Sequence, residues 1–100
     1  MTAGRVEIHP EALAEAAIAL DWYSDRSARA AAAFLSEVDK ALQSISNAPQ
    51  RWPIYEENCR RYPLFRFPYF IVYREKAEHV IQIVAVAHSR RLPGYWHGRI

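Results

Sequence analysis

Hydrophobic and polar residues alternate along this chain in patterns that predict six secondary-structure elements. Residues 80–87 are apolar except for Gln82 and rich in β-branched side chains, which is typical of a strand buried on both faces in the middle of a sheet. Residues 5–9 instead alternate polar and apolar side chains, as a short half-buried strand does. We therefore expect one central strand and one strand with an exposed face.

Two further strands precede the central one. Residues 59–65 are predicted to be extended, and Pro63 places them at an edge of the sheet because proline cannot donate a hydrogen bond to a neighbouring strand. Residues 69–75 form the next predicted strand, and residues 76–78 form a short polar turn that leads into the central strand. Three successive strands with short links predict an antiparallel meander.

Two helices are predicted between the first strand and the meander. Pro10 begins the first helix, because proline at the first helical position loses no intrahelical hydrogen bond. The residues expected to face the sheet are Leu13, Ala16, Ala17, Ile18, Leu20 and Trp22. Residues 28–46 place apolar residues at i, i+3, i+4 and i+7, which predicts a second helix that residues 24–27 cap and that Asn47 ends.

The connection formed by residues 49–58 contains two prolines and no sustained period, so we expect it to cross the surface. Trp52 and Tyr55 are expected to fold back onto the core as a lid, and the alternative is an exposed aromatic platform for a base or a partner. The predicted order is therefore β-α-α-β-β-β. It describes a single α+β domain, residues 1–100, with a helical hairpin packed on a mainly antiparallel four-stranded sheet.

Composition excludes several classes of protein. The one cysteine, Cys59, cannot form an internal disulfide, and neither a signal peptide nor an apolar span of about 18 residues is present. We therefore expect a soluble cytoplasmic protein with no membrane partner. The four histidines are scattered and the three glycines form no phosphate-binding loop, so we expect no metal site and no cofactor.

The net charge of +2 is unevenly distributed. Residues 1–59 hold five Arg and Lys against nine Asp and Glu, whereas residues 60–100 hold eight against two, so the two parts carry −4 and +6. A basic half with interleaved aromatic residues suits a polyanion or an acidic protein partner, because clustered guanidinium groups attract negative surfaces. The plainer interpretation is a solvated basic sheet edge without a partner.

The candidate chemistry lies just beyond the central strand, where His88, Arg91 and Tyr95 fall within eight residues. Such a set could cleave RNA without a metal ion. A base would take the 2′-hydroxyl proton, guanidinium groups would stabilise the charge on the phosphate, and an acid would protonate the leaving oxygen. Arg61 or Arg66 would supply a second guanidinium group.

These residues also have ordinary structural interpretations. His88 would satisfy backbone groups at a strand end, Arg90 or Arg91 would pair with an acidic partner, and Trp96 would pack against the sheet. A binding surface needs the same side chains without catalytic geometry. The residues predicted for such a surface are Arg60, Arg61, Arg66, Arg74, His88, Arg90, Arg91, Tyr95 and Trp96.

A resemblance to a known family rests on two segments, R-R-Y-P-L-F-R-F-P-Y-F-I-V-Y-R at 60–74 and V-A-V-A-H-S-R-R-L-P-G-Y-W at 84–96. With the order β-α-α-β-β-β, they make the chain similar to the RelE/ParE superfamily of toxins from bacterial type II toxin–antitoxin modules, once called plasmid stabilisation proteins. The resemblance covers nearly the whole chain. It implies a growth inhibitor in a hetero-oligomeric complex with a cognate antitoxin, ParD-like or similar, whose acidic tail wraps the helices and the basic sheet.

The superfamily implies two different targets. RelE-like members cleave messenger RNA on the ribosome with strand-borne Lys and Arg and a C-terminal tyrosine, whereas ParE-like members lack this set and poison DNA gyrase. On this chain Arg61 matches one strand lysine and Tyr95 matches the tyrosine, but Phe65 stands where the principal strand arginine would be. Arg66 lies one residue away, which in a strand turns it to the other face. Arg91 lies near the expected C-terminal arginine without coinciding with it.

This partial match favours a ParE-like gyrase poison that is not an enzyme. The alternative is a RelE-like, ribosome-dependent and metal-independent endoribonuclease, with His88, Arg91, Tyr95 and either Arg61 or Arg66 as its catalytic residues. A third possibility is an inactive member that only binds its antitoxin.

Overall fold

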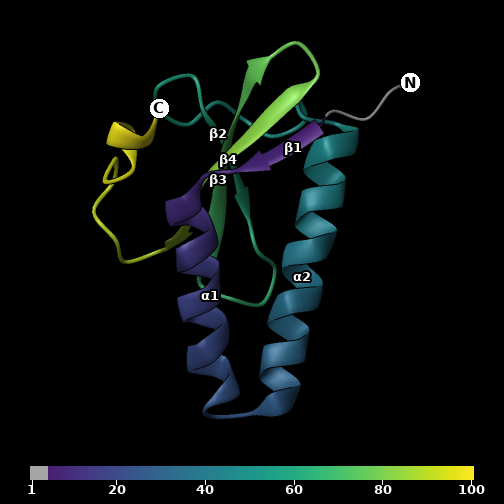
Figure 1. Ribbon diagram of the computed structural model, residues 1–100, viewed down its shortest axis with the longest axis vertical. Helices are drawn as coiled ribbons and strands as arrows, with labels where there is room; N and C mark the ends of the chain where they lie inside the picture. The colour runs from purple at the N-terminus through teal and green to yellow at the C-terminus, as the bar shows by residue number, and fades with distance from the viewer. Residues whose placement is uncertain (1–4) are drawn as a thin grey trace.

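The computed structural model describes residues 5–100 and confirms the predicted order of elements. The elements are β1 (Arg5–Ile8), α1 (Pro10–Ser24), α2 (Ala28–Asn47), β2 (Arg60–Pro63), β3 (Tyr69–Ala77), β4 (Val80–His88) and a short 3₁₀ helix, η1 (His97–Arg99). The two helices lie side by side as a hairpin that covers one face of the sheet and projects beyond it at the turn that joins them (Figure 1). The fold is the predicted α+β arrangement.

The sheet has the strand order β1-β4-β3-β2. β1 runs parallel to β4, whereas β3 is antiparallel to both β4 and β2, so the sheet is mainly antiparallel as predicted. β4 lies between β1 and β3, and residues 81, 83 and 84–87 of this strand are buried, which confirms the central position expected from its apolar sequence. β2, which ends at Pro63, occupies an edge, also as predicted.

Two strand boundaries differ by two residues from those predicted, and the others differ by at most one. β3 continues to Ala77, so the hairpin to β4 turns through Glu78 and His79 alone, with His79 in the left-handed region at a φ of 58°. β2 spans only residues 60–63, so residues 64 and 65, predicted as strand, belong to the loop that leads to β3. This second correction moves Phe65 from a sheet to an exposed loop.

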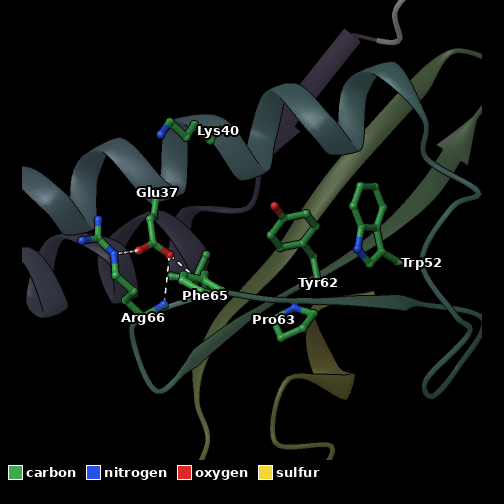
Figure 2. Close-up of a pocket in the computed structure, with 8 residues that line it drawn as sticks. Glu37, Lys40, Trp52, Tyr62, Pro63, Phe65 and Arg66 are labelled. Carbon is green, nitrogen blue, oxygen red and sulfur yellow. Dashed lines mark hydrogen bonds and ion pairs between the residues drawn. The ribbon is translucent and has the colours of Figure 1, made fainter.

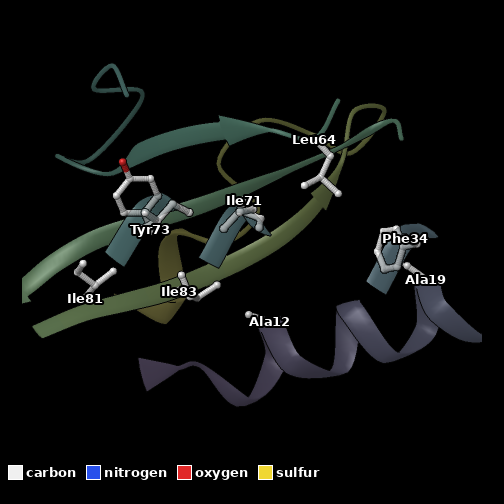
Figure 3. Packing of buried hydrophobic residues seen from close by; sticks show 10 residues of the cluster. Ala12, Ala19, Phe34, Leu64, Ile71, Tyr73, Ile81 and Ile83 are labelled. Carbon is white, nitrogen blue, oxygen red and sulfur yellow. The ribbon is translucent and has the colours of Figure 1, made fainter. Parts of the chain in front are cut away.

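The main hydrophobic core lies between the helices and the sheet (Figure 3). Phe34 and Ile45 of α2 meet Ile71 and Tyr73 of β3 and Ile83 of β4 there, each at most 1% exposed. The Tyr73 hydroxyl donates a hydrogen bond of 2.6 Å to the carbonyl oxygen of Pro49, and burial of the ring raises the pKa of Tyr73 to about 12. A buried phenol is therefore satisfied by the chain that follows α2.

The sheet-facing side of α1 differs from the prediction. The residues buried on this helix are Ala12 and Ala19, whereas Leu13, Ile18 and Trp22 are 58%, 70% and 50% exposed. Apolar residues surround α1 on most sides, so their spacing alone could not identify the face that meets the sheet. The small side chains face the sheet and let the helix approach it, and three large apolar side chains of α1 are left at the surface.

A second apolar cluster lies on the opposite face of the sheet. It contains Cys59, Val72, Val84 and Trp96, with Trp96 only 1% exposed, and Tyr55 packs against it. The C-terminal segment thus covers the face that the helices leave open. Trp52 packs against the main core instead, so both aromatic residues of the 49–58 connection fold back as predicted, on opposite faces of the sheet.

None of the helices within residues 5–100 is both long and apolar enough to cross a membrane.

Candidate functional site

A β-bulge in β4 decides which side chains reach the candidate site. Tyr73 pairs with Ile83 and Val72 pairs with Ala85, so Val84 is an extra residue in β4. Before the bulge Ile83 faces the helices, and after it Val86 and His88 do. Because an inserted residue reverses the alternation of faces, the bulge brings His88 to the helix side of the sheet.

His88 lines a groove of about 210 Å³ between α1 and the ends of β3 and β4. Two other predicted site residues, Arg91 and Tyr95, line the same groove. The remaining lining residues, supplied by α1, β3 and β4, are Glu15, Ile18, Ala19, Tyr69 and Val86. A second hollow of about 260 Å³ shares four of these residues and continues toward Trp22 and Pro68. The structure therefore brings together the three C-terminal residues that the sequence placed within one short segment.

The His88 ring is held by two contacts. Its Nδ1 accepts a hydrogen bond of 3.1 Å from the backbone N–H of Arg90, and its plane lies nearly perpendicular to the ring of Tyr69, with centroids 5.0 Å apart. A neutral imidazole that accepts at Nδ1 carries its proton on Nε2. His88 therefore satisfies a backbone group at the strand end, as its structural interpretation expected, and keeps Nε2–H as a donor.

Glu15, which the sequence did not single out, organises the floor of this groove. Its carboxylate accepts hydrogen bonds from the Tyr95 hydroxyl at 2.7 Å, from the backbone N–H of Val86 at 3.0 Å, and from both terminal nitrogens of Arg99 at 2.9 and 3.0 Å. Arg99 also donates to the carbonyl oxygen of Val84 at 3.1 Å. The side chains of Glu15 and Arg99 are only 15% and 9% exposed.

These contacts seal a sheet edge. β1 ends opposite Ile83, so the next residues of β4 have no strand beside them, and Glu15 and Arg99 take the place of that strand by pairing with the backbone of Val86 and Val84. The sequence does not indicate that Glu15 and Arg99 cover this strand edge together, because they lie 84 positions apart.

The same cluster sets the ionisation of its members. Burial alone would raise the pKa of Glu15, but hydrogen bonds from Arg99, Tyr95 and Val86 outweigh it and lower the pKa below its ordinary value. Burial and the hydrogen bond to Glu15 raise the pKa of Tyr95 far above that of a free phenol. The Tyr95 hydroxyl is thus a committed donor to Glu15 rather than a ready acid or base.

The remaining residues of the C-terminal segment differ in exposure. The Arg91 guanidinium lies 3.9 Å above the centre of the Tyr95 ring and is otherwise exposed, as is Arg90. Trp96, predicted as part of a binding surface, is buried in the second cluster and lies behind that surface.

The strand arginines lie away from this groove. Arg61 is exposed on the opposite face of the sheet, 4.8 Å from the ring centres of both Tyr55 and Phe70. Arg66 lies in the β2–β3 loop, where its Nε donates to Glu37 of α2 at 2.8 Å. No hydrogen bond or ion pair within residues 5–100 links either arginine to the groove. The five predicted catalytic residues are therefore divided among three places.

Two other arginines predicted for a binding surface hold parts of the fold. Arg60 donates to the carbonyl oxygen of Trp52 at 2.6 Å and so fixes the 49–58 connection to β2. Arg74 donates from Nε to the side-chain oxygen of Gln82 on the neighbouring strand at 2.8 Å. Both side chains are half-buried.

An apolar groove between the helices was not foreseen from the sequence. It has a volume of about 210 Å³, and its lining residues are Leu13, Ala16, Ala17, Leu20, Phe34, Leu35 and Val38. Leu13 and Leu35 on its rim are 58% and 49% exposed. The signal for it is the excess of apolar residues around α1, more than one sheet-facing side requires.

The groups that bind metal ions are dispersed in the part of the chain that the structure describes, where no three His, Cys, Asp or Glu side chains are arranged around a common point.

Comparison with known proteins gives a family. The model of the family described as "ParE toxin of type II toxin-antitoxin system, parDE" matches residues 6–93. The chain belongs to the ParE toxin family. A solved structure titled "Chromosomal ParDE TA system from P. aeruginosa" contains a similar chain, with a TM-score of 0.75 and 17% sequence identity over 86% of this chain and 96% of that one. At this identity the similarity shows the fold that the two chains share. No curated protein matches the sequence.

Membership of the ParE family agrees with the RelE/ParE resemblance that the sequence suggested and with the ParE side of that superfamily. The match includes both α-helices, all but the first residue of the sheet, and the loop that carries Phe65 and Arg66, and it ends before η1.

Proposed function

We propose that this ParE-family protein is the growth-inhibiting toxin of a type II toxin–antitoxin system, that it acts in the cytoplasm by poisoning DNA gyrase, and that a cognate antitoxin neutralises it. Family membership supports the toxin–antitoxin part of this proposal. The dispersal of the ribonuclease residues supports the choice of gyrase. Arg66 is paired with Glu37, Arg61 lies on the other face of the sheet, and Tyr95 donates to Glu15.

Two features support neutralisation by an antitoxin with an acidic, amphipathic tail. The groove between α1 and α2 is lined by apolar side chains, which suits the apolar face of a helix. Residues 60–100 carry a net charge of +6, which suits the acidic residues of such a tail. The solved structure with a similar fold carries ParDE in its title, and we infer a ParD-like partner for this chain as well.

A RelE-like ribonuclease is the second candidate, because His88, Arg91 and Tyr95 do share one groove. The two targets predict different products. With purified gyrase, ATP and supercoiled DNA, a gyrase poison makes enzyme-linked, cleaved DNA accumulate. With translating ribosomes, a RelE-like enzyme cuts transcripts at the codon in the ribosomal A site.

We expect the protein to produce cleaved DNA and to leave transcripts intact. Transcripts cut on the ribosome, with gyrase unaffected, would refute the gyrase proposal. A protein that captures its antitoxin but acts in neither assay would be an inactive member of the family.

A further inference from the structure

An exposed aromatic side chain is held rigidly in the loop between β2 and β3. Phe65 is 91% exposed, the largest exposure among the large hydrophobic residues of the described chain. The Glu37 carboxylate accepts the backbone N–H groups of Phe65 and Arg66 at 2.9 and 3.3 Å, and its other oxygen accepts from Nε of Arg66 at 2.8 Å (Figure 2). Three hydrogen bonds from one carboxylate thus fix the backbone that carries Phe65.

Glu37 is well suited to this task. Its side chain is only 11% exposed, and although burial alone would raise its pKa, the hydrogen bonds from Arg66 and Phe65 keep the pKa below its ordinary value. The clamp is therefore charged at neutral pH. A loop already ordered before binding loses less entropy when a partner is bound, so a clamped, protruding phenylalanine is a favourable anchor for an interface.

Beside Phe65 lies a cleft of about 520 Å³. Trp52 and Tyr62 line it with ring centres 4.6 Å apart (Figure 2), and Pro63, Leu64 and Phe65 are also among its lining residues. Aromatic side chains are enriched in the cores of protein interfaces relative to the rest of the surface, and this cleft combines two aromatic rings with the protruding side chain of Phe65.

The charged rim of this cleft is cationic. The charge of Glu37 is already engaged by Arg66, whose two terminal nitrogens make no hydrogen bond within residues 5–100. Lys40, one turn along α2, has no ion-pair partner in the same range and lines the cleft. A partner protein complementary to this surface would have an apolar pocket that accepts the Phe65 ring, and carboxylates around that pocket would face Arg66 and Lys40.

The position of the cleft separates it from the groove between the helices. Glu37 and Leu35 are two residues apart on α2, which at 3.6 residues per turn puts their side chains about 160° apart around the helix axis. Leu35 lines the groove between α1 and α2, whereas Glu37 lines the cleft beside Phe65. A helix lying in the first groove leaves the second surface uncovered.

We propose that Phe65 and the adjoining cleft form the surface by which this toxin binds its target protein, with Phe65 entering an apolar pocket bordered by carboxylates. This inference rests on the proposed toxin function and deepens it by placing target and antitoxin on opposite sides of α2. Glu37 is a positioning residue, because it acts by holding the loop.

The test compares Phe65→Ala with the wild-type protein in two assays that do not depend on the identity of the target. Growth arrest is measured after induction in a bacterial host without antitoxin, and binding is measured with the purified cognate antitoxin. Truncating an aromatic anchor typically weakens an interface by about thirtyfold or more, so we expect Phe65→Ala to lose growth arrest at equal expression. We expect antitoxin affinity and thermal stability to stay at wild-type values.

Two variants complete the design. Leu92→Ala removes another highly exposed apolar side chain, 79% exposed in the C-terminal segment, and should keep full growth arrest. Glu37→Ala keeps Phe65 but removes the clamp, and we expect a partial loss of growth arrest. Glu37→Gln should restore much of it, because the amide oxygen of glutamine can still accept the two backbone N–H groups.

Each outcome decides something. Full growth arrest by Phe65→Ala overturns the inference, and so does a variant that keeps growth arrest but loses its antitoxin, because Phe65 would then be an antitoxin contact. A wild-type protein that arrests growth without poisoning gyrase refutes the proposed target but leaves the Phe65 surface testable by growth. A wild-type protein that never arrests growth overturns both proposals.

Discussion

The buried cluster around Glu15 offers a stringent test of how the C-terminal segment is attached. We predict that Glu15→Ala lowers the free energy of unfolding by about 3 kcal/mol, because removing one partner of a buried ion pair leaves the other charge uncompensated. Arg99, 9% exposed, would keep the Val84 carbonyl, the Tyr95 ring at 5.1 Å, and Glu11, whose carboxylate oxygen lies 3.7 Å from its Nε. Breaking a buried ion pair in this way costs about 3–5 kcal/mol, and the residual contact with Glu11 places this case at the lower end.

Further contacts of Glu15 add to this cost. The substitution also deprives the Val86 N–H and the Tyr95 hydroxyl of their acceptor, and buried unsatisfied groups cost about 1–3 kcal/mol each where water cannot replace the partner. Tyr95 is only half-buried, so water can replace part of the lost hydrogen bonding, and the total cost stays at about 3 kcal/mol rather than rising by the full amount for both groups. For a chain of this size, about 3 kcal/mol corresponds to a fall in Tm of roughly 15 °C.

The assay is thermal and urea unfolding of purified variants. Asp21→Ala is the matched control, since Asp21 is an exposed acidic residue of the same helix, and we expect it to change stability by less than about 0.5 kcal/mol. A double-mutant cycle with Arg99→Ala should show strong coupling between Glu15 and Arg99. Equal stabilities of Glu15→Ala and Asp21→Ala, or additive effects in the cycle, would refute the argument.

Two further predictions concern acid and the second helix. The folded-state pKa of Glu15 lies below its ordinary value of 4.5, so the stability that its charged form contributes is present above pH 4.5 and is lost as pH falls through the lowered pKa. The difference in unfolding free energy between wild type and Glu15→Gln, measured by urea unfolding from pH 7 to pH 3, should therefore shrink below pH 4.5. A constant difference would contradict this. Ser27 caps α2 by accepting the N–H of Ala30 at 3.1 Å, so Ser27→Ala should cost about 1 kcal/mol in the same assay, whereas Ser36→Ala, in the exposed middle of α2, should not destabilise the protein.

The elements could be predicted from the sequence because their patterns are local. The run of apolar, β-branched residues in β4 favours a doubly buried strand, Pro63 favours an edge position, and the regular apolar spacing of α2 indicates its buried side. The same reasoning was largely wrong for α1, where apolar residues lie on most sides of the helix: Leu20 packs against the core as predicted, but the fully buried positions are Ala12 and Ala19. Helix periodicity identifies a buried face only when the other faces are polar.

The candidate site was only partly predictable because its geometry depends on long-range contacts. Spacing along the chain correctly grouped His88, Arg91 and Tyr95, which lie within eight residues. Glu15 was missed, because a glutamate in the first half of an amphipathic helix is ordinarily solvated, and nothing local indicates that residues from the far end of the chain bury it.

The bulge at Val84 and the early end of β2 show why residue types alone do not define such a site. Without the extra residue in β4, His88 would lie on the sheet face opposite the helices, which is the face that carries Arg61. The predicted catalytic residues would then be less divided. Because β2 ends at Pro63, Phe65 is freed from the strand alternation and projects from a loop that Glu37 holds. The inserted residue in β4 therefore separates His88 from Arg61, two members of the predicted ribonuclease set. The early end of β2 leaves Phe65 exposed in a loop. The proposed binding of a target protein through Phe65 rests on this geometry.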